Sequence, residues 1–82
     1  MDLRIEDVLK RKGKDIQFVA DKLGVTYNAV YLRMKGNMRI DKLEEIANVL
    51  GTEAAELIET KGEYSHFYDD KTGEWLGIRK KN

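Results

Sequence analysis

The sequence predicts a mainly α-helical domain that ends in a β-hairpin. Up to residue 61, apolar residues recur every three or four positions, and glycines separate the helical segments. From residue 62 onward, two runs rich in aromatic residues flank a turn-forming segment, which is typical of paired strands. We therefore expect residues 1–61 to form the helical domain and residues 62–82 the hairpin. The chain of 82 residues is too short for a second core.

The composition excludes several classes of protein. The chain has no cysteine, which excludes disulfides and thiolate zinc sites and favours a cytoplasmic location. No apolar run approaches the length of a membrane span, so no membrane partner is expected. Basic and acidic side chains cancel at fifteen each, but residues 1–40 carry nine basic and five acidic ones, whereas residues 41–63 carry two and seven. The charge is therefore polarised, and its positive part is N-terminal.

The first helix is expected over residues 2–12. Ile5, Val8 and Leu9 form its apolar stripe, and Gly13 ends it. Basic residues cluster at its C-terminal end, where they complement the helix dipole; phosphate contact is the less favoured alternative.

Residues 15–36 are the segment around which the rest is organised. Asp15 is a good N-cap for a helix that ends at Gly24, where the left-handed conformation of a C-cap is cheap for glycine. Thr26 is a good N-cap for a second helix, which extends to about Lys35. That helix buries a narrow stripe, Val30 and Met34, and leaves polar and aromatic side chains outside. Such a surface predicts a binding function.

Two further helices are expected after this segment. The first, residues 40–50, would bury Ile40, Leu43, Ile46, Ala47 and Leu50 before Gly51 caps it, and a short fifth helix would follow over residues 52–58. Their exposed faces would be acidic and would repel phosphate groups; these residues are Asp41, Glu44, Glu45, Glu53, Glu56 and Glu59.

The hairpin is expected to have a loop over residues 70–73. This loop would pair Tyr68 with Trp75, Phe67 with Leu76, Ser65 with Ile78 and Tyr64 with Arg79. Both faces would then carry large apolar groups. One face would cover the helical domain, since a lone hairpin is marginal in water, and the other is a candidate dimer surface.

The segments VADKLGVT at residues 19–26, KGN at residues 35–37 and LEEIANVLG at residues 43–51, with Val30, resemble the phage-repressor-like helix-turn-helix family, also called Cro/cI-type or XRE-type. The resemblance implies a five-helix lambda-repressor-like domain. It also implies a sequence-specific regulator of transcription, of bacterial or phage type, that binds double-stranded DNA, usually as a homodimer. Ile16 departs from the family, which often has a phosphate-binding Gln at this position.

The resemblance also implies which residues contact DNA. The recognition helix, residues 26–35, would enter the major groove, and its first exposed positions would read base edges. In this chain these positions are Thr26, Tyr27, Asn28, Tyr31 and Leu32.

Asn28 is the strongest of these candidates, because a carboxamide can bond an adenine edge through both of its polar atoms. Leu32 either contacts thymine methyl groups or packs against neighbouring helices. Lys35, Asn37 and Arg39 would contact the DNA backbone, and Arg33 suits either role.

Nothing in the sequence predicts catalysis, a cofactor, a metal site or a small-molecule substrate. His66 is the only histidine, and there is no catalytic constellation or phosphate-binding glycine loop. The alternative function is a protein-interaction module on the same fold, antitoxin-like or an adaptor, that uses the aromatic hairpin to bind its partner.

Overall fold

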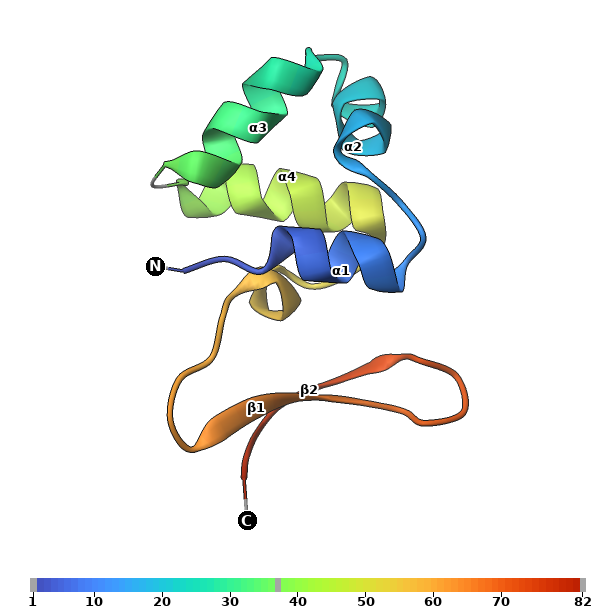
Figure 1. Ribbon diagram of the computed structural model, residues 1–82, viewed down its shortest axis with the longest axis vertical. Helices are drawn as coiled ribbons and strands as arrows, with labels where there is room; N and C mark the ends of the chain where they lie inside the picture. The colour runs from blue at the N-terminus through green and yellow to red at the C-terminus, as the bar shows by residue number, and fades with distance from the viewer. Residues whose placement is uncertain (1, 37, 82) are drawn as a thin grey trace.

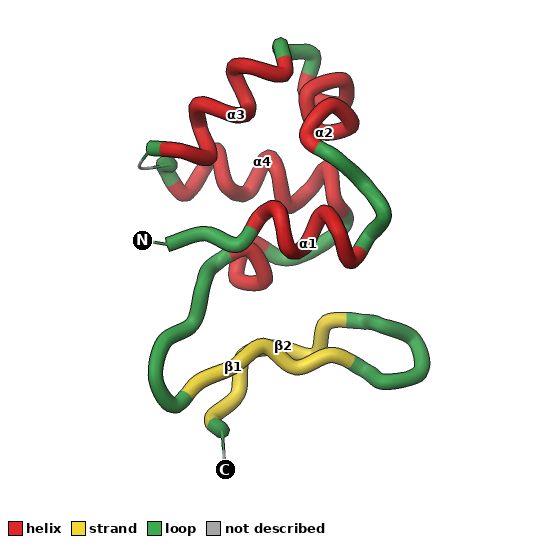
Figure 2. The backbone as a smooth tube through the Cα atoms, in the orientation of Figure 1, coloured by secondary structure: helices red, strands yellow, loops and turns green. Residues whose placement is uncertain are grey.

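The computed structural model describes residues 2–36 and 38–81. This part of the chain contains four α-helices, one 3-10 helix and one two-stranded antiparallel sheet (Figures 1 and 2). In chain order these are α1 (Ile5–Arg11), α2 (Ile16–Leu23), α3 (Tyr27–Lys35), α4 (Ile40–Leu50), η1 (Ala54–Leu57), β1 (Tyr64–Tyr68) and β2 (Trp75–Lys80).

The molecule is elongated, with extents of 41 × 27 × 17 Å. The helices form one block, and the hairpin lies at the end of the long axis opposite to α3 (Figure 1). The N-terminus, the end of α3 and the beginning of α4 lie on one side of the block (Figures 1 and 2).

The hydrophobic core lies inside the helical block and contains most of the residues predicted to be buried, but Met34 is only partly buried and packs against the edge of the core. Its buried members are Ile5, Val8, Leu9, Val19, Ala20, Val30, Met38, Leu43, Ile46, Ala47, Leu50 and Leu57. Ile40 was predicted to be buried, but it is 57% exposed. It is the first residue of α4, and the buried stripe of α4 starts one turn later, at Leu43; Met38 from the preceding loop joins the core instead.

The prediction of a fifth α-helix is wrong. Residues 54–57 form a single 3-10 helix, and Ile58 pairs with Leu3 in an antiparallel bridge. Backbone hydrogen bonds from Arg4 N to Leu57 O and from Glu59 N to Asp2 O, each 2.9 Å long, accompany this bridge. The N-terminal segment and the segment after η1 therefore bond to each other, so α1 begins at Ile5 instead of residue 2.

The hairpin contains a β-bulge that the sequence did not predict. Tyr68 pairs with Trp75 as expected, but the register then shifts by one residue, so Phe67 pairs with Gly77, Ser65 with Arg79, and Tyr64 with Lys80. The predicted pairs of Phe67 with Leu76, Ser65 with Ile78 and Tyr64 with Arg79 are therefore wrong.

The shift changes the face on which Ile78 lies. Gly77 has φ +124°, a conformation that suits glycine, and it follows the extra residue Leu76. Because side chains alternate between faces, the extra residue brings Ile78 opposite His66, on the face that meets the helical domain.

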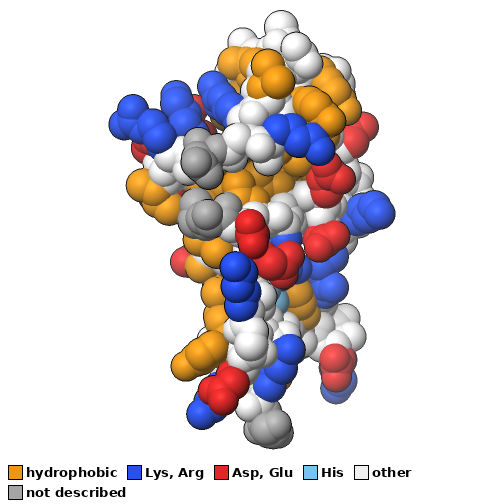
Figure 3. All heavy atoms as spheres, turned by 60° about the vertical axis from the view of Figure 1, so that its left-hand side comes forward, with side chains coloured by type: hydrophobic (Ala, Val, Ile, Leu, Met, Phe, Trp, Pro, Cys, Tyr) orange, Lys and Arg blue, Asp and Glu red, His pale blue; other side chains and the backbone are white. Residues whose placement is uncertain are grey.

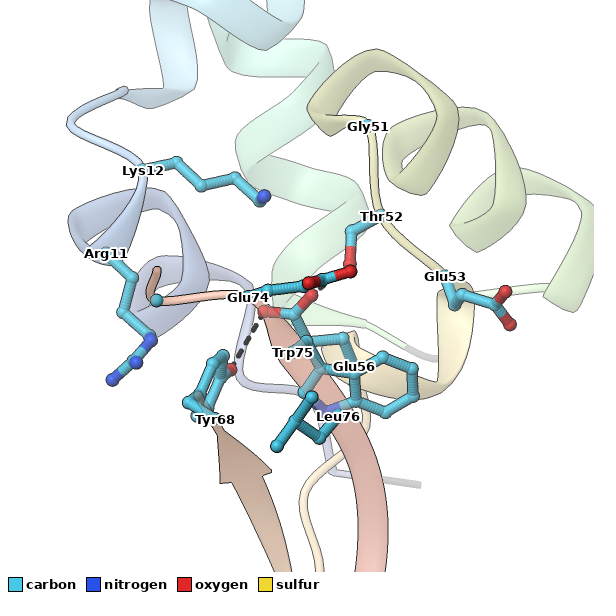
Figure 4. A pocket seen from close by; sticks show the side chains of 11 residues that line it. Arg11, Lys12, Gly51, Thr52, Glu53, Glu56, Tyr68, Glu74, Trp75 and Leu76 are labelled. Atoms are coloured by element: carbon cyan, nitrogen blue, oxygen red, sulfur yellow. Dashed lines mark hydrogen bonds between the residues drawn. The ribbon is translucent and has the colours of Figure 1, made fainter. Parts of the chain in front are cut away.

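Tyr68 anchors the hairpin to the helical block. Its hydroxyl donates to Glu56 Oε2 at 2.8 Å and accepts from Arg4 Nη2 at 2.9 Å, while the Arg11 guanidinium lies 3.4 Å from the ring centroid. Figure 4 shows the bond between Tyr68 and Glu56. Burial, and next the hydrogen bond to Glu56, raise the pKa of the Tyr68 hydroxyl.

Glu56 was predicted to lie on an exposed acidic face, but it is only 2% exposed. Its carboxylate accepts hydrogen bonds from the hydroxyls of Thr52 and Tyr68, which stabilise the buried group. A cavity of about 640 Å³ remains beside these contacts, between α1, the turn after α4 and the hairpin (Figure 4).

His66 makes the second contact between the hairpin and the helical block. Its Nδ1 lies 3.0 Å from Trp75 Nε1, and its Nε2 lies 2.7 Å from the Ile58 carbonyl oxygen. Because an indole nitrogen only donates, Nδ1 accepts and Nε2 carries the proton that is donated to Ile58. His66 therefore has a structural role, in which Trp75 and Ile58 are its hydrogen-bond partners.

Candidate nucleic-acid interface

Side-chain caps and a left-handed glycine fix the geometry of α2 and α3. Asp15 accepts a hydrogen bond from Phe18 N at 2.9 Å, and Thr26 Oγ1 accepts one from Ala29 N at 3.1 Å, so both predicted N-caps are confirmed. Gly24 ends α2 with φ 70° and ψ 31°, and Val25 N then bonds to Ala20 O at 3.0 Å. These local bonds set the turn that orients α3 relative to α2.

The outer face of α3 is free of the core. Val30 is fully buried, whereas Thr26, Tyr27 and Asn28 are exposed at the N-terminal end of the helix. Leu32 is 61% exposed, so it does not pack against the neighbouring helices as one of its two predicted roles required. Because Leu32 is exposed beside Asn28, this face can make both polar and hydrophobic contacts.

The aromatic side chains of α3 form a row along one edge of the helix. The rings of Tyr27 and Tyr31 are stacked, with centroids 6.4 Å apart and planes at 12°, and Lys35 Nζ lies 5.1 Å from the Tyr31 centroid. The three residues are spaced four apart, so they follow each other on the helix surface. Tyr31 is half-buried in this row and is less available than Tyr27.

The cationic candidates differ in their surroundings. Lys35 is exposed, and the exposed Arg39 side chain forms an ion pair with Asp41, with Nε 3.3 Å from Oδ1. Arg33 is half-buried, and its Nη1 is a buried atom without a hydrogen-bond partner among residues 2–36 and 38–81. Asn37 lies outside the described residues. On the helical part of the face shown in Figure 3, Lys and Arg side chains gather at the upper left.

The structure contains no feature of a metal site or membrane span in the part that it describes. No three His, Asp or Glu side chains are grouped closely enough to hold a metal ion among these residues. None of the helices seen here is both long and apolar enough to cross a membrane.

Two short helices joined by a tight turn, with the second one capped, anchored by Val30 and exposed on its other side, define a helix-turn-helix protein. A family model of the Cro/C1-type HTH DNA-binding domain matches residues 4–63. The chain belongs to this DNA-binding family, as its sequence motifs indicated. No curated protein and no solved structure matched the chain. The family match ends at residue 63, immediately before β1, so the hairpin lies outside it.

The sequence did not reveal the residues that join the hairpin to the helices. These residues are far apart in the sequence, and the local pattern around each one is that of an ordinary surface residue; they are Arg4, Arg11, Glu56 and Tyr68. The spacing of Thr52 and Glu56, one helical turn apart, was the only local signal of their contact.

Proposed function

We propose that the protein is a sequence-specific regulator of transcription, of bacterial or phage type, that binds double-stranded DNA as a homodimer with α3 in the major groove. One observation carries this proposal: the N-terminal end of α3 is exposed and polar while Val30, at its centre, fixes the helix to the core. The N-terminal end of a recognition helix is the part that meets base edges in helix-turn-helix proteins.

The proposed base contacts come from the exposed face of α3. Asn28 pairs with an adenine edge through both its amide atoms, and Leu32 contacts a thymine methyl group. Thr26 and Tyr27 flank Asn28 and contact a neighbouring base or phosphate through their hydroxyls. Tyr31 supports the Tyr27 ring from behind, as their stacking favours.

The proposed backbone contacts come from the C-terminal end of α3 and the loop after it. Lys35, Asn37 and Arg39 bind phosphates and set the position of the protein without reading sequence. Arg33 lies in the last turn of the same helix and joins them through its positive charge, while its Nη1 is a buried atom that faces the protein.

Selection of bound duplexes from a random library tests the proposed function. The expected result is an enriched motif with two half-sites about 34 Å apart, one turn of the duplex, arranged as an approximate palindrome. Fluorescence anisotropy then measures the affinity for this motif and for a scrambled duplex at several salt concentrations. Failure to enrich any motif at low salt would contradict sequence-specific binding.

A second candidate function is a protein-interaction module that uses the hairpin. The hairpin lies outside the residues matched by the DNA-binding family. The net charge of the whole chain is zero, whereas strong DNA binders usually carry an excess of basic residues. Deleting the hairpin would uncover Glu56, so point variants are the better test. If Phe67→Glu abolishes regulation but leaves the affinity for DNA unchanged, the interaction module is favoured. If Asn28→Ala abolishes regulation, DNA recognition is favoured.

A further inference from the structure

The hairpin face that meets the helical block is only partly covered by it. Tyr64, His66 and Tyr68 alternate onto this face of β1, and Ile78 of β2 lies opposite His66. His66 and Tyr68 bond to the helical block, but Tyr64 is 51% exposed and Ile78 is 40% exposed. The end of the hairpin that carries Tyr64 and Ile78 therefore extends past the helical block and exposes apolar side chains beside it.

This overhang continues onto the helical block as a strip of apolar side chains. His66 bonds to the carbonyl of Ile58, and Ile58 pairs with Leu3. Leu3 in turn lines one hollow together with Met34, near the end of α3; the charged residues Arg4, Glu6 and Asp7 line the same hollow. We call this set the side strip; its members are Met34, Leu3, Ile58, Ile78 and Tyr64. Figure 3 shows hydrophobic side chains along this side of the molecule, from the helical block down to the hairpin.

The opposite face of the hairpin offers much less apolar surface. Phe67, 38% exposed, is its large apolar side chain and faces Gly77 across the sheet, whereas Leu76 at the bulge, 45% exposed, lines the cavity on the side of the helical block. The neighbouring pair is Ser65 and Arg79, which are polar. The β-bulge is the cause, because it removes Ile78 from this face. The outer face is therefore a poorer dimer surface than the sequence suggested.

Symmetry also favours the side strip as the contact between two copies. The hairpin and α3 lie at opposite ends of the 41 Å axis (Figure 1). Packing two outer hairpin faces together would direct the two α3 helices away from each other. A two-fold axis parallel to the long axis, with side strip against side strip, places both α3 helices at the same end, where one duplex can meet both.

We propose that a second copy of this chain covers the side strip, related by a two-fold axis along the length of the molecule. This inference rests on the proposed function, since the direction of both α3 helices decides between the surfaces. A specific dimer buries about 800 Å² per partner. A side 41 Å long and 17 Å deep, with side chains projecting from it, provides an area of that order.

Two lysine substitutions of the hairpin form a matched test. Ile78 and Phe67 have nearly the same exposure, 40% and 38%, but lie on opposite faces. Sedimentation equilibrium is expected to give a dimer for the unchanged protein and for Phe67→Lys. Ile78→Lys is expected to raise the dissociation constant at least tenfold, because a charge would be buried twice at a symmetric interface. Far-UV circular dichroism and the fluorescence of Trp75, the only tryptophan, report whether each variant is folded.

Three results would overturn the proposal: a monomer at hundreds of micromolar protein, an equal effect of both substitutions, or a larger effect of Phe67→Lys. If Ile78→Lys unfolds, cross-linking replaces it. The chain has no cysteine, so Tyr64→Cys and Ser65→Cys each introduce a single thiol, and the two thiols lie on opposite faces of β1. A short bis-maleimide is expected to link Tyr64→Cys into dimers and to leave Ser65→Cys mostly monomeric; the reverse would refute the side strip.

The same experiments separate this inference from the proposed function. If the protein dimerises through the side strip but enriches no DNA motif, the inferred interface stands and the proposed regulatory function is refuted. If the protein enriches a single half-site and stays monomeric, DNA recognition by α3 stands and the inferred interface is refuted.

Discussion

Removing a single hydroxyl, with Tyr68→Phe, should destabilise the whole domain. The ring remains and still packs under Arg11, but Glu56 Oε2 loses its 2.8 Å donor in a residue that is only 2% exposed. A hydrogen bond to a charged group contributes about 1.5–3 kcal/mol, and the carboxylate keeps its bond from Thr52. Arg4 is only half-buried and regains water as a partner. We therefore expect a loss of about 2 kcal/mol in the free energy of unfolding.

This loss is measurable by urea denaturation followed through circular dichroism and Trp75 fluorescence. For a domain of this size it corresponds to a decrease of roughly 8–16 °C in Tm. Tyr64→Phe is the matched control, because Tyr64 lies on the same face of the same strand but is 51% exposed, and its stability should change by less than about 0.5 kcal/mol. If Tyr68→Phe is as stable as this control at equal protein concentration, the Tyr68–Glu56 contact does not hold the hairpin in place.

Three further predictions concern DNA contacts and pH. Asn28→Ala should weaken binding to the selected motif by about 1–3 kcal/mol and relax the preference at one base pair, while Asn48→Ala on α4 should have no such effect in anisotropy titrations. Lys35→Ala should weaken binding to every sequence alike and reduce the salt slope by about one unit, whereas Lys71→Ala in the hairpin loop should leave the slope unchanged. Because the pKa of Tyr68 is raised in the folded state, its contribution to stability is complete below about pH 10 and is lost as the pH rises through the folded value. Urea denaturation between pH 8 and 11 should therefore show a decline that Tyr68→Phe lacks; equal declines would refute the assignment.

The elements predicted well from the sequence are those that are decided within a few residues. Asp15 and Thr26 cap their helices through bonds that span three residues, and Gly24 and Gly51 end theirs in the left-handed conformation. None of these interactions needs a distant partner, so the sequence contains all the information that fixes them. The helix-turn-helix geometry follows from these caps together with the buried stripe that includes Val30.

The features that the sequence did not predict depend on pairs of residues that are far apart along the chain. Leu3 meets Ile58, and this contact shortens both α1 and the expected fifth helix. Glu56 has the spacing of an exposed helical residue, but it is buried because Tyr68 of the hairpin packs against it and donates a hydrogen bond to its carboxylate. The bulge beside Gly77 likewise satisfies packing against the helical block, which turn chemistry alone does not encode.

The candidate site shows the same division between local and distant causes. Helical periodicity predicted that Tyr27, Asn28 and Tyr31 face outward and left the side of Leu32 open. The structure finds Tyr27, Asn28 and Leu32 exposed and Tyr31 half-buried. The side from which a second copy would approach was not predictable, because it depends on the strand register at Ile78. A one-residue shift in the hairpin moves this side chain from the outer face to the side strip. The bulge would therefore set the direction of the two recognition helices in a dimer, although it lies at the opposite end of the molecule from them.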